Sequence, residues 1–155
     1  MDIVKLQIQK KRKELLFLFS KVYSGGLRGI DGYVVQVEAD VSDGLPGFYM
    51  VGSLASEVRE AEERVRTAMR NAGFHLSARK ITVNLSPANV RKEGTACDLP
   101  VAIAVLAAYG IVMPSGLKQT GFLGELGLDG KIKPVRGVLS MVLAMAEKGL
   151  ERCFL

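Results

Sequence analysis

Hydrophobic and polar residues alternate along the first half of the chain with the period of two that is typical of half-buried β-strands. The alternation is clearest around Val35 and Val37, which share one side of a predicted strand with polar neighbours on the other. Glycine and aspartate at 29–32, and again at 43–44, interrupt the pattern as hairpin turns do. We therefore predict an antiparallel meander of three strands, over residues 21–27, 33–41 and 46–51.

Further along the chain, apolar residues recur every three or four positions, which predicts three helices. The first begins at Ser53, its predicted cap, and ends at Gly73; its glutamates precede its arginines, as the helix dipole favours. The second begins at Asp98, also a predicted cap, and is almost entirely apolar, so we place it in the core. The third covers residues 138–148, and Gly149 ends it.

Short alternating segments predict additional strands around the two later helices. One, at residues 81–85, stops before Pro87, because proline lacks the N–H group that a sheet requires. The expected fold class is therefore α+β, a mixed sheet of roughly five to seven strands with helices packed on it. The other predicted strands lie at 119–125 and 131–135, on either side of a turn at 127–130, and at 152–155.

Composition describes one soluble globular domain. The chain has 155 residues, 48% hydrophobic and 24% charged, and no apolar run approaches the ~20 residues that a membrane span needs. The start shows no secretory leader pattern. Cys97, Cys153 and the single histidine, His75, form no disulfide framework and no metal site of recognised spacing. We expect a cytoplasmic protein with reduced cysteines and no membrane partner.

The net charge of +5 is divided unevenly along the chain. Residues 1–18 carry +3 of it, chiefly through a basic run at 10–13, and the remainder is only mildly basic. Such a run is typical of a solvated arm, but basic arms also bind nucleic acid, and the sequence leaves both interpretations open. We treat residues 1–18 as a basic, flexible extension and residues 19–155 as the domain.

Two basic pairs make the candidate nucleic-acid site. One opens the central strand and the other ends the loop after it, so both are predicted on neighbouring edges of one surface, where such side chains hold phosphates. Solvated charge, or salt bridges to Glu93 and Asp98, is the alternative interpretation. The few phenylalanines and tyrosines are spread along the chain, so stacking of single-stranded bases is not predicted. The candidate residues are Arg79, Lys80, Arg91 and Lys92.

The sequence contains no motif for binding or hydrolysing a nucleoside triphosphate. A phosphate-binding loop needs G-x-x-x-x-G-K-S/T between a strand and a helix, and that pattern does not occur. The glycines near 24–26 and 124–127 lack this context and are expected in turns. We therefore expect no cofactor in this chain and no ATP hydrolysis by it.

Three segments, taken in order, give the sequence a family resemblance: DGLPGFYMVG at 43–52, RKITVNLSPANVRKEGTACDLPVAIAVLAA at 79–108 and FLGELGLDGKIKPVRGVL at 122–139. Together they resemble the N-terminal domain of ComM/YifB-type proteins, often labelled magnesium-chelatase-like, over about residues 19–155. In that family an AAA+ ATPase follows this domain. The resemblance implies that this ATPase part of the protein, with its ATP and Mg²⁺, lies beyond Leu155.

The central segment is also similar, more distantly, to the proteolytic domain of Lon proteases and to the C-terminal domain of RadA. This similarity implies a Lon/RadA-like fold of the ribosomal-protein domain 2-like type, with a left-handed βαβ crossover instead of the usual right-handed one. Lon uses a serine nucleophile and a lysine base, and their places match Ala96 and Met141 here. Neither side chain can perform that chemistry. Thr95 and Cys97 flank the vacated position, without a lysine that matches the base.

The resemblance implies a ring-forming ATPase, expected to be a hexamer, that acts on DNA in recombination and branch migration during natural transformation. This chain is expected to be its non-catalytic N-terminal domain, in contact with DNA, with a partner or with the ring. A pure protein-interaction or oligomerisation module is the first alternative, and a divergent Lon-like peptidase is the second. Metal insertion into a porphyrin, which the chelatase label suggests, has no support in these residues.

Overall fold

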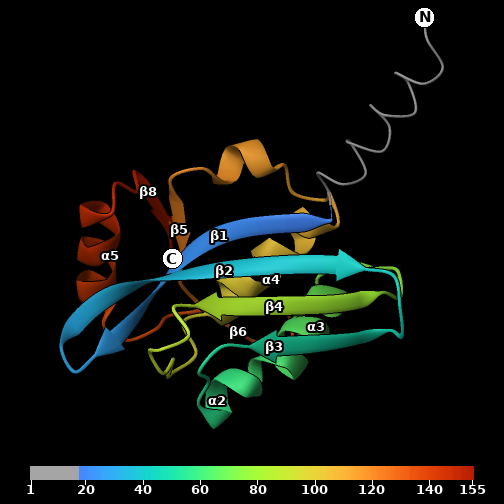
Figure 1. Cartoon of the computed structure of the whole chain (residues 1–155), viewed down its shortest axis with the longest axis horizontal. Helices are drawn as coiled ribbons and strands as arrows, with labels where there is room; N and C mark the ends of the chain where they lie inside the picture. The colour runs from blue at the N-terminus through green and yellow to red at the C-terminus, as the bar shows by residue number, and fades with distance from the viewer. Residues whose placement is uncertain (1–17) are drawn as a thin grey trace, which may run out of the picture.

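The computed structural model describes residues 18–155, and all but the last residue of the predicted N-terminal extension lies outside them. The described part is a mixed sheet with helices packed on it, which confirms the predicted α+β class (Figure 1). Its strands are β1 (Phe19–Arg28), β2 (Asp31–Ser42), β3 (Gly47–Val51), β4 (Lys80–Ser86), β5 (Thr120–Phe122), β6 (Glu125–Leu126), β7 (Ile132–Lys133) and β8 (Arg152–Phe154). Its helices are α2 (Ser56–Arg59), α3 (Ala61–Asn71), α4 (Asp98–Ala108), the short 3₁₀ helix η1 (Pro114–Leu117) and α5 (Val138–Glu147).

The large sheet has the strand order β3-β4-β2-β1-β5-β8. β1 and β2 form the predicted hairpin, but the meander is wrong beyond it, because β4 lies between β2 and β3. β4 runs antiparallel to β2 and parallel to β3. Parallel neighbours need a crossover connection that returns the chain to the same end of the sheet, and α2 and α3 provide it.

The predicted strand at 119–125 divides in two. Its first part, β5, joins the large sheet parallel to β1 and β8, and its last residue starts β6, which pairs with β7 around the predicted turn. The first predicted helix also divides, since α2 begins after Ala55 and α3 after Glu60. Ser53 is not a cap; its carbonyl accepts the backbone N–H of Lys92 at 2.8 Å.

α3 and α4 cover one face of the large sheet and lie behind the strands in Figure 1, whereas α5 packs on the other face, where Met141 and Val34 belong to a second apolar cluster. The alternate residues of β2 and β4 that face α3 and α4 are buried, and they form most of the core with α4. Ten of the eleven residues of α4 are buried, which confirms it as the core helix. Ser20 on β1 joins the layers by donating a hydrogen bond to the Ala104 carbonyl at 2.6 Å.

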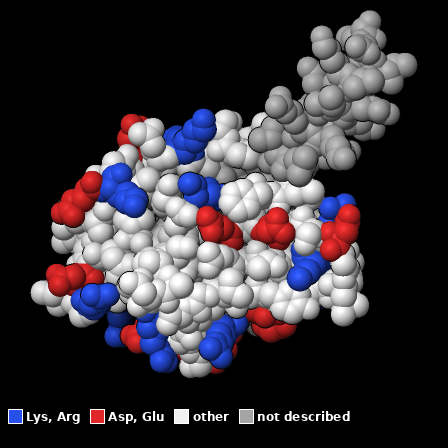
Figure 2. Space-filling view, viewed as in Figure 1, with Lys and Arg blue, Asp and Glu red and all other residues white. Residues whose placement is uncertain are grey.

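α5 leaves part of this second face open to solvent, and this open face carries a polar network centred on Glu38. Its two carboxylate oxygens accept hydrogen bonds from Gln36 at 2.7 Å and from Asn84 at 3.0 Å, and Asn84 also donates to Ser86 at 3.1 Å. Asp40, one step along β2, is exposed on the same side. Figure 2 shows acidic side chains near the middle of this face.

The prediction that Asp98 caps α4 is wrong, because its carboxylate is buried in an ion pair. It accepts two hydrogen bonds from Arg64 on α3, at 2.8 and 3.1 Å, and one from the backbone N–H of Leu126 in β6, at 3.2 Å. The Asp98 side chain is 1% exposed and that of Arg64 is 21% exposed. Burial raises the pKa of Asp98, and the Arg64 guanidinium opposes this shift. One carboxylate therefore joins α3, α4 and β6.

None of the helices within residues 18–155 is long and apolar enough to cross a membrane.

Replacing Arg64 by methionine should lower the free energy of unfolding by about 3 kcal/mol at pH 7, because an unpaired carboxylate would stay buried. The pKa of Asp98 in the folded variant would rise further above its unfolded value. The folded variant would then hold a proton more tightly than the unfolded chain, so its deficit relative to the parent should shrink as the pH falls through that pKa. Urea denaturation at several pH values measures both effects.

The matched control is Arg66→Met on the same helix, since Arg66 pairs with Glu63 at 3.4 Å in an exposed position. Arg66→Met should lower the free energy of unfolding by less than about 1 kcal/mol at every pH. Equal losses for the two variants would contradict the role of the buried pair.

Gly32→Ala should destabilise the protein by about 2 kcal/mol or more, because overpacking forces the backbone apart. A Cβ at Gly32 in β2 would overlap the Ser140 carbonyl of α5. A Cβ at Gly116 would meet nothing within 4 Å, so Gly116→Ala should leave the melting temperature nearly unchanged. Similar melting temperatures for the two variants would show that α5 is not packed against β2 in this way.

Candidate functional site

The first predicted basic pair lies at the surface where β4 begins. Arg79 is partly exposed, and its Nη2 lies 3.8 Å from Asp43 Oδ1. Lys80 is exposed, and its Nζ lies 5.8 Å from the centre of the Tyr49 ring, in cation–π contact. Both side chains are placed where a phosphate can reach them.

The second pair lies at the other end of β4, so the prediction of one shared surface is wrong. The seven residues of β4 span roughly 20 Å. The loop after the strand turns back and pairs with Leu54, just after β3, which keeps it at that far end. Arg91 is exposed there and lies 3.8 Å from Glu93, one of the two predicted salt bridges.

Lys92 faces the interior and not the solvent. Only 1% of its surface is exposed, and its Nζ donates a hydrogen bond to the Pro87 carbonyl. Its backbone carbonyl accepts the N–H of Ala55 at 3.0 Å, so it also ties the loop to the start of α2. Burial lowers the pKa of Lys92. This lysine therefore fastens the loop, and the solvent-facing candidates are Arg79, Lys80 and Arg91.

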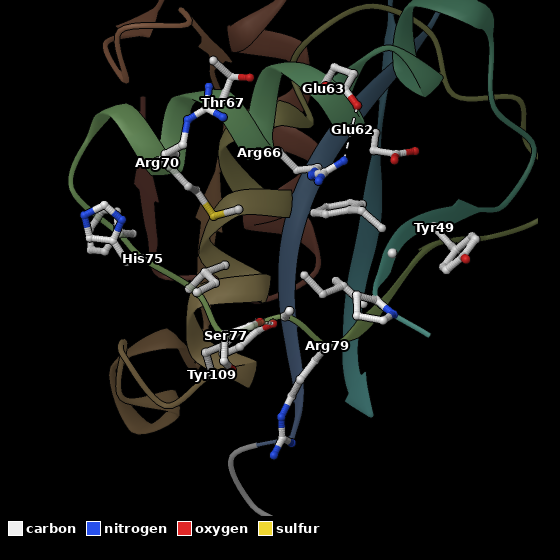
Figure 3. A pocket seen from close by; sticks show the side chains of 18 residues that line it. Tyr49, Glu62, Glu63, Arg66, Thr67, Arg70, His75, Ser77, Arg79 and Tyr109 are labelled. Atoms are coloured by element: carbon white, nitrogen blue, oxygen red, sulfur yellow. Dashed lines mark hydrogen bonds and ion pairs between the residues drawn. The ribbon is translucent and has the colours of Figure 1, made fainter. Parts of the chain in front are cut away.

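A groove of about 650 Å³ opens beside Arg79 (Figure 3). One wall is α3, and the other is the segment from Phe74 to Arg79 that leads into β4, with Tyr109 at the end of α4. Its floor is apolar, formed by Phe48, Met69 and Ile81, which belong to the core. The groove therefore combines apolar contact area with the charged side chains on its rim.

The rim of the groove carries three arginines from two elements, Arg66 and Arg70 on α3 and Arg79 before β4. Figure 3 shows Arg66 between α3 and the strands, with Glu62 and Glu63 toward one end of the groove. Sequence analysis missed Arg66 and Arg70, because the charges of this helix were explained by pairing along it. The four-residue spacing that places them on one face of α3 was the available signal.

The two positions that the resemblance assigns to a serine and a lysine lie in one apolar cluster. Met141 is 1% exposed and forms the cluster with Leu123 and Met145, and Ala96 packs against it. The backbone around Ala96 is also occupied, since its carbonyl accepts the N–H of Gly124 at 3.1 Å. Side chains that carry no lysine or serine group therefore surround Met141 in this part of the fold.

The two substitute nucleophiles are both engaged in other contacts. Thr95 Oγ1 donates a hydrogen bond to Glu125 Oε2 at 2.6 Å. Cys97 is 5% exposed, and its Sγ lies 3.8 Å from Ser24 Oγ. Burial raises the pKa of the Cys97 thiol to about 11, which leaves almost no thiolate at neutral pH.

Among residues 18–155, no group of three His, Cys, Asp or Glu side chains is arranged to hold a metal ion. The structure therefore offers no assembled carboxylate, imidazole or thiolate ligand set in that part of the chain.

Over residues 37–155 the chain matches the family described as subunit ChlI of Mg-chelatase. It is 46% identical to the competence protein ComM of Haemophilus influenzae over 123 residues, which cover 79% of this chain and 24% of that protein. It is 40% identical to the uncharacterized protein YifB of Escherichia coli over 130 residues, 84% of this chain and 26% of that protein.

A more distant similarity is to the Lon protease of Mycolicibacterium smegmatis, with 27% identity over 136 residues, 82% of this chain and 17% of the protease. The chain spans about a quarter of the length of the ComM and YifB relatives that it matches. The ordered motifs at 43–52, 79–108 and 122–139 all lie within the family match at 37–155. Because the family match covers well over half of the chain, the protein belongs to the family of subunit ChlI of Mg-chelatase, together with ComM and YifB.

Proposed function

We propose that this chain is the non-catalytic N-terminal domain of a ComM/YifB-like protein whose remaining part is an AAA+ ATPase that acts on DNA. In this proposal the ATPase part, with ATP and Mg²⁺, forms a hexameric ring in the cytoplasm, and the domain described here contacts the DNA. Recombination and branch migration during natural transformation are the proposed process, which fits the name of the competence protein among the relatives.

The observation that carries the non-catalytic part is the apolar cluster around Met141. A Ser-Lys peptidase needs a hydroxyl beside a lysine whose pKa is lowered. Ala96 and Met141 supply neither group, and they occupy the space in which a dyad would stand. Lys92, the one lysine buried among residues 18–155, donates a hydrogen bond to the Pro87 carbonyl.

The DNA-contacting part is supported by the exposed cations at the start of β4. Arginine and lysine side chains hold backbone phosphates and position a nucleic acid without reading its sequence. Arg79 and Lys80 are both accessible, and Glu38 and Asp40, which lie further into the sheet on β2, would repel a phosphate backbone laid across its middle. DNA is therefore proposed to approach from the β3–β4 edge.

Neutralising the exposed candidates, as R79Q/K80Q/R91Q, should weaken duplex DNA binding about tenfold and flatten its salt dependence. Each lost phosphate contact should reduce the slope of log K against log salt by about 0.9. Fluorescence anisotropy at several salt concentrations measures both quantities. Lys92 is left unchanged, because it is buried and its replacement would destabilise the loop without removing a DNA contact.

The matched control is K131Q/K133Q/K148Q, which removes the same charge from the β6–β7 hairpin and the end of α5. It should bind DNA almost as the parent does. Concentration-dependent assembly of a parent chain that binds no DNA would instead favour the interaction-module alternative.

The peptidase alternative is tested with a fluorogenic peptide. The parent chain, Thr95→Ala and Cys97→Ala should all show the same background turnover. Turnover that either alanine variant abolishes would refute the non-catalytic assignment.

The burial of Cys97 predicts the order in which the two thiols react. At pH 8 a thiol-reactive dye should label the partly exposed Cys153 first and reach Cys97 only on unfolding, since a thiol of pKa about 11 is barely ionised at that pH.

A further inference from the structure

Aromatic side chains that are scattered along the sequence come together at the groove beside α3. Phe74 follows α3 and is 37% exposed, and Tyr109 follows α4. The Tyr109 hydroxyl donates a hydrogen bond to the Ser77 carbonyl at 2.8 Å, which fixes its ring against the wall of the groove. Phe74 and Tyr109 thus line, together with Tyr49, a groove whose floor is already apolar.

The arginines on the rim are available to an anionic ligand. Arg66 makes an exposed contact with Glu63 at 3.4 Å, of a kind that contributes little and exchanges readily. Its guanidinium, and those of Arg70 and Arg79, have the planar fork that binds a phosphate through two parallel hydrogen bonds. Three such cations outnumber the two glutamates of the groove.

We propose that this groove binds a short segment of single-stranded nucleic acid. Its phosphates lie on the α3 side of the groove, on Arg66 and Arg70, and an unpaired base lies against Phe74 and Tyr109. The proposal rests on the proposed function, a DNA-contacting domain, and names the form of DNA and the residues that hold it.

The apolar surface decides between single-stranded and duplex DNA. In a duplex the base faces are stacked on one another, so an aromatic side chain in a groove of the protein has no base face to contact. An unpaired base offers that face without regard to its identity. The volume of about 650 Å³ lies within the ~300–1,000 Å³ of sites that hold small ligands, which suits one or two nucleotides and not a double helix.

The test compares a fluorescein-labelled oligothymidine with a duplex of the same length by fluorescence anisotropy. R66Q/R70Q should weaken oligothymidine binding about tenfold and reduce its salt slope by about 1.4, or 0.7 for each contact. Phe74→Ala should weaken oligothymidine binding about fivefold or more, and leave both the salt slope and the duplex affinity unchanged. Phe74→Tyr should bind as the parent does, because it keeps an aromatic ring.

The control for charge is R136Q/K148Q, which removes two cations at the two ends of α5, and it should bind oligothymidine nearly as the parent does. Thermal melts establish that each variant is folded. Phe74 is not a member of the buried core, so its truncation is expected to be tolerated.

Parent-like oligothymidine affinity in both R66Q/R70Q and Phe74→Ala would overturn the groove proposal. If R79Q/K80Q/R91Q still lost duplex binding, the proposed function would stand without it. Displacement of oligothymidine by polyglutamate of equal charge, as effectively as by unlabelled oligothymidine, would show a site for acidic protein and would also overturn the proposal. A parent chain that binds neither nucleic acid would refute the proposed function itself.

Discussion

The packing of this domain depends on one buried carboxylate. Asp98 stands at the first turn of α4, where its negative charge would ordinarily be hydrated, and the fold instead surrounds it with the Arg64 guanidinium and the Leu126 N–H. A buried charge is tolerated only when hydrogen bonds replace its water. These hydrogen bonds therefore fix the positions of α3, α4 and the β6–β7 hairpin relative to one another. Because α3 is one wall of the groove, they also help to fix the shape of the groove.

The segment around Ala96 and Met141 is held together without charged side chains. The segment around Ala96 is held by backbone hydrogen bonds to Gly124, and Met141 fills the adjoining space with Leu123 and Met145. These contacts are hydrophobic or involve the main chain, so they need no ionisable group. Methionine suits such a position, because its flexible side chain fills irregular space.

Sequence reasoning located the elements but not their partners. Alternation in β2 and the apolar run of α4 report burial directly, so both were predicted. The position of β4 between β2 and β3 depends on a crossover whose path no local pattern encodes. Asp98 was read as a cap because its partner, Arg64, lies 34 positions away in sequence.

The same limit applies to the candidate site. Lys92 looked like a surface charge, since lysines are rarely buried, and only the fold of its loop places its ammonium on the Pro87 carbonyl. The groove could not be predicted from the sequence either, because its residues come from separate elements. It is assembled from the face of α3, the segment after it and the end of α4, and its arginines and aromatic residues have ordinary local explanations.

The polar network on the open face, beside α5, restricts how copies of this domain can associate. Glu38 already satisfies its oxygens within the sheet, so it offers few vacant acceptors to a neighbour. Two sheets laid against each other through this face would have to dehydrate Glu38 and Asp40 of both molecules, which is costly. This part of the sheet can therefore stay in contact with water without stacking on the same part of another copy.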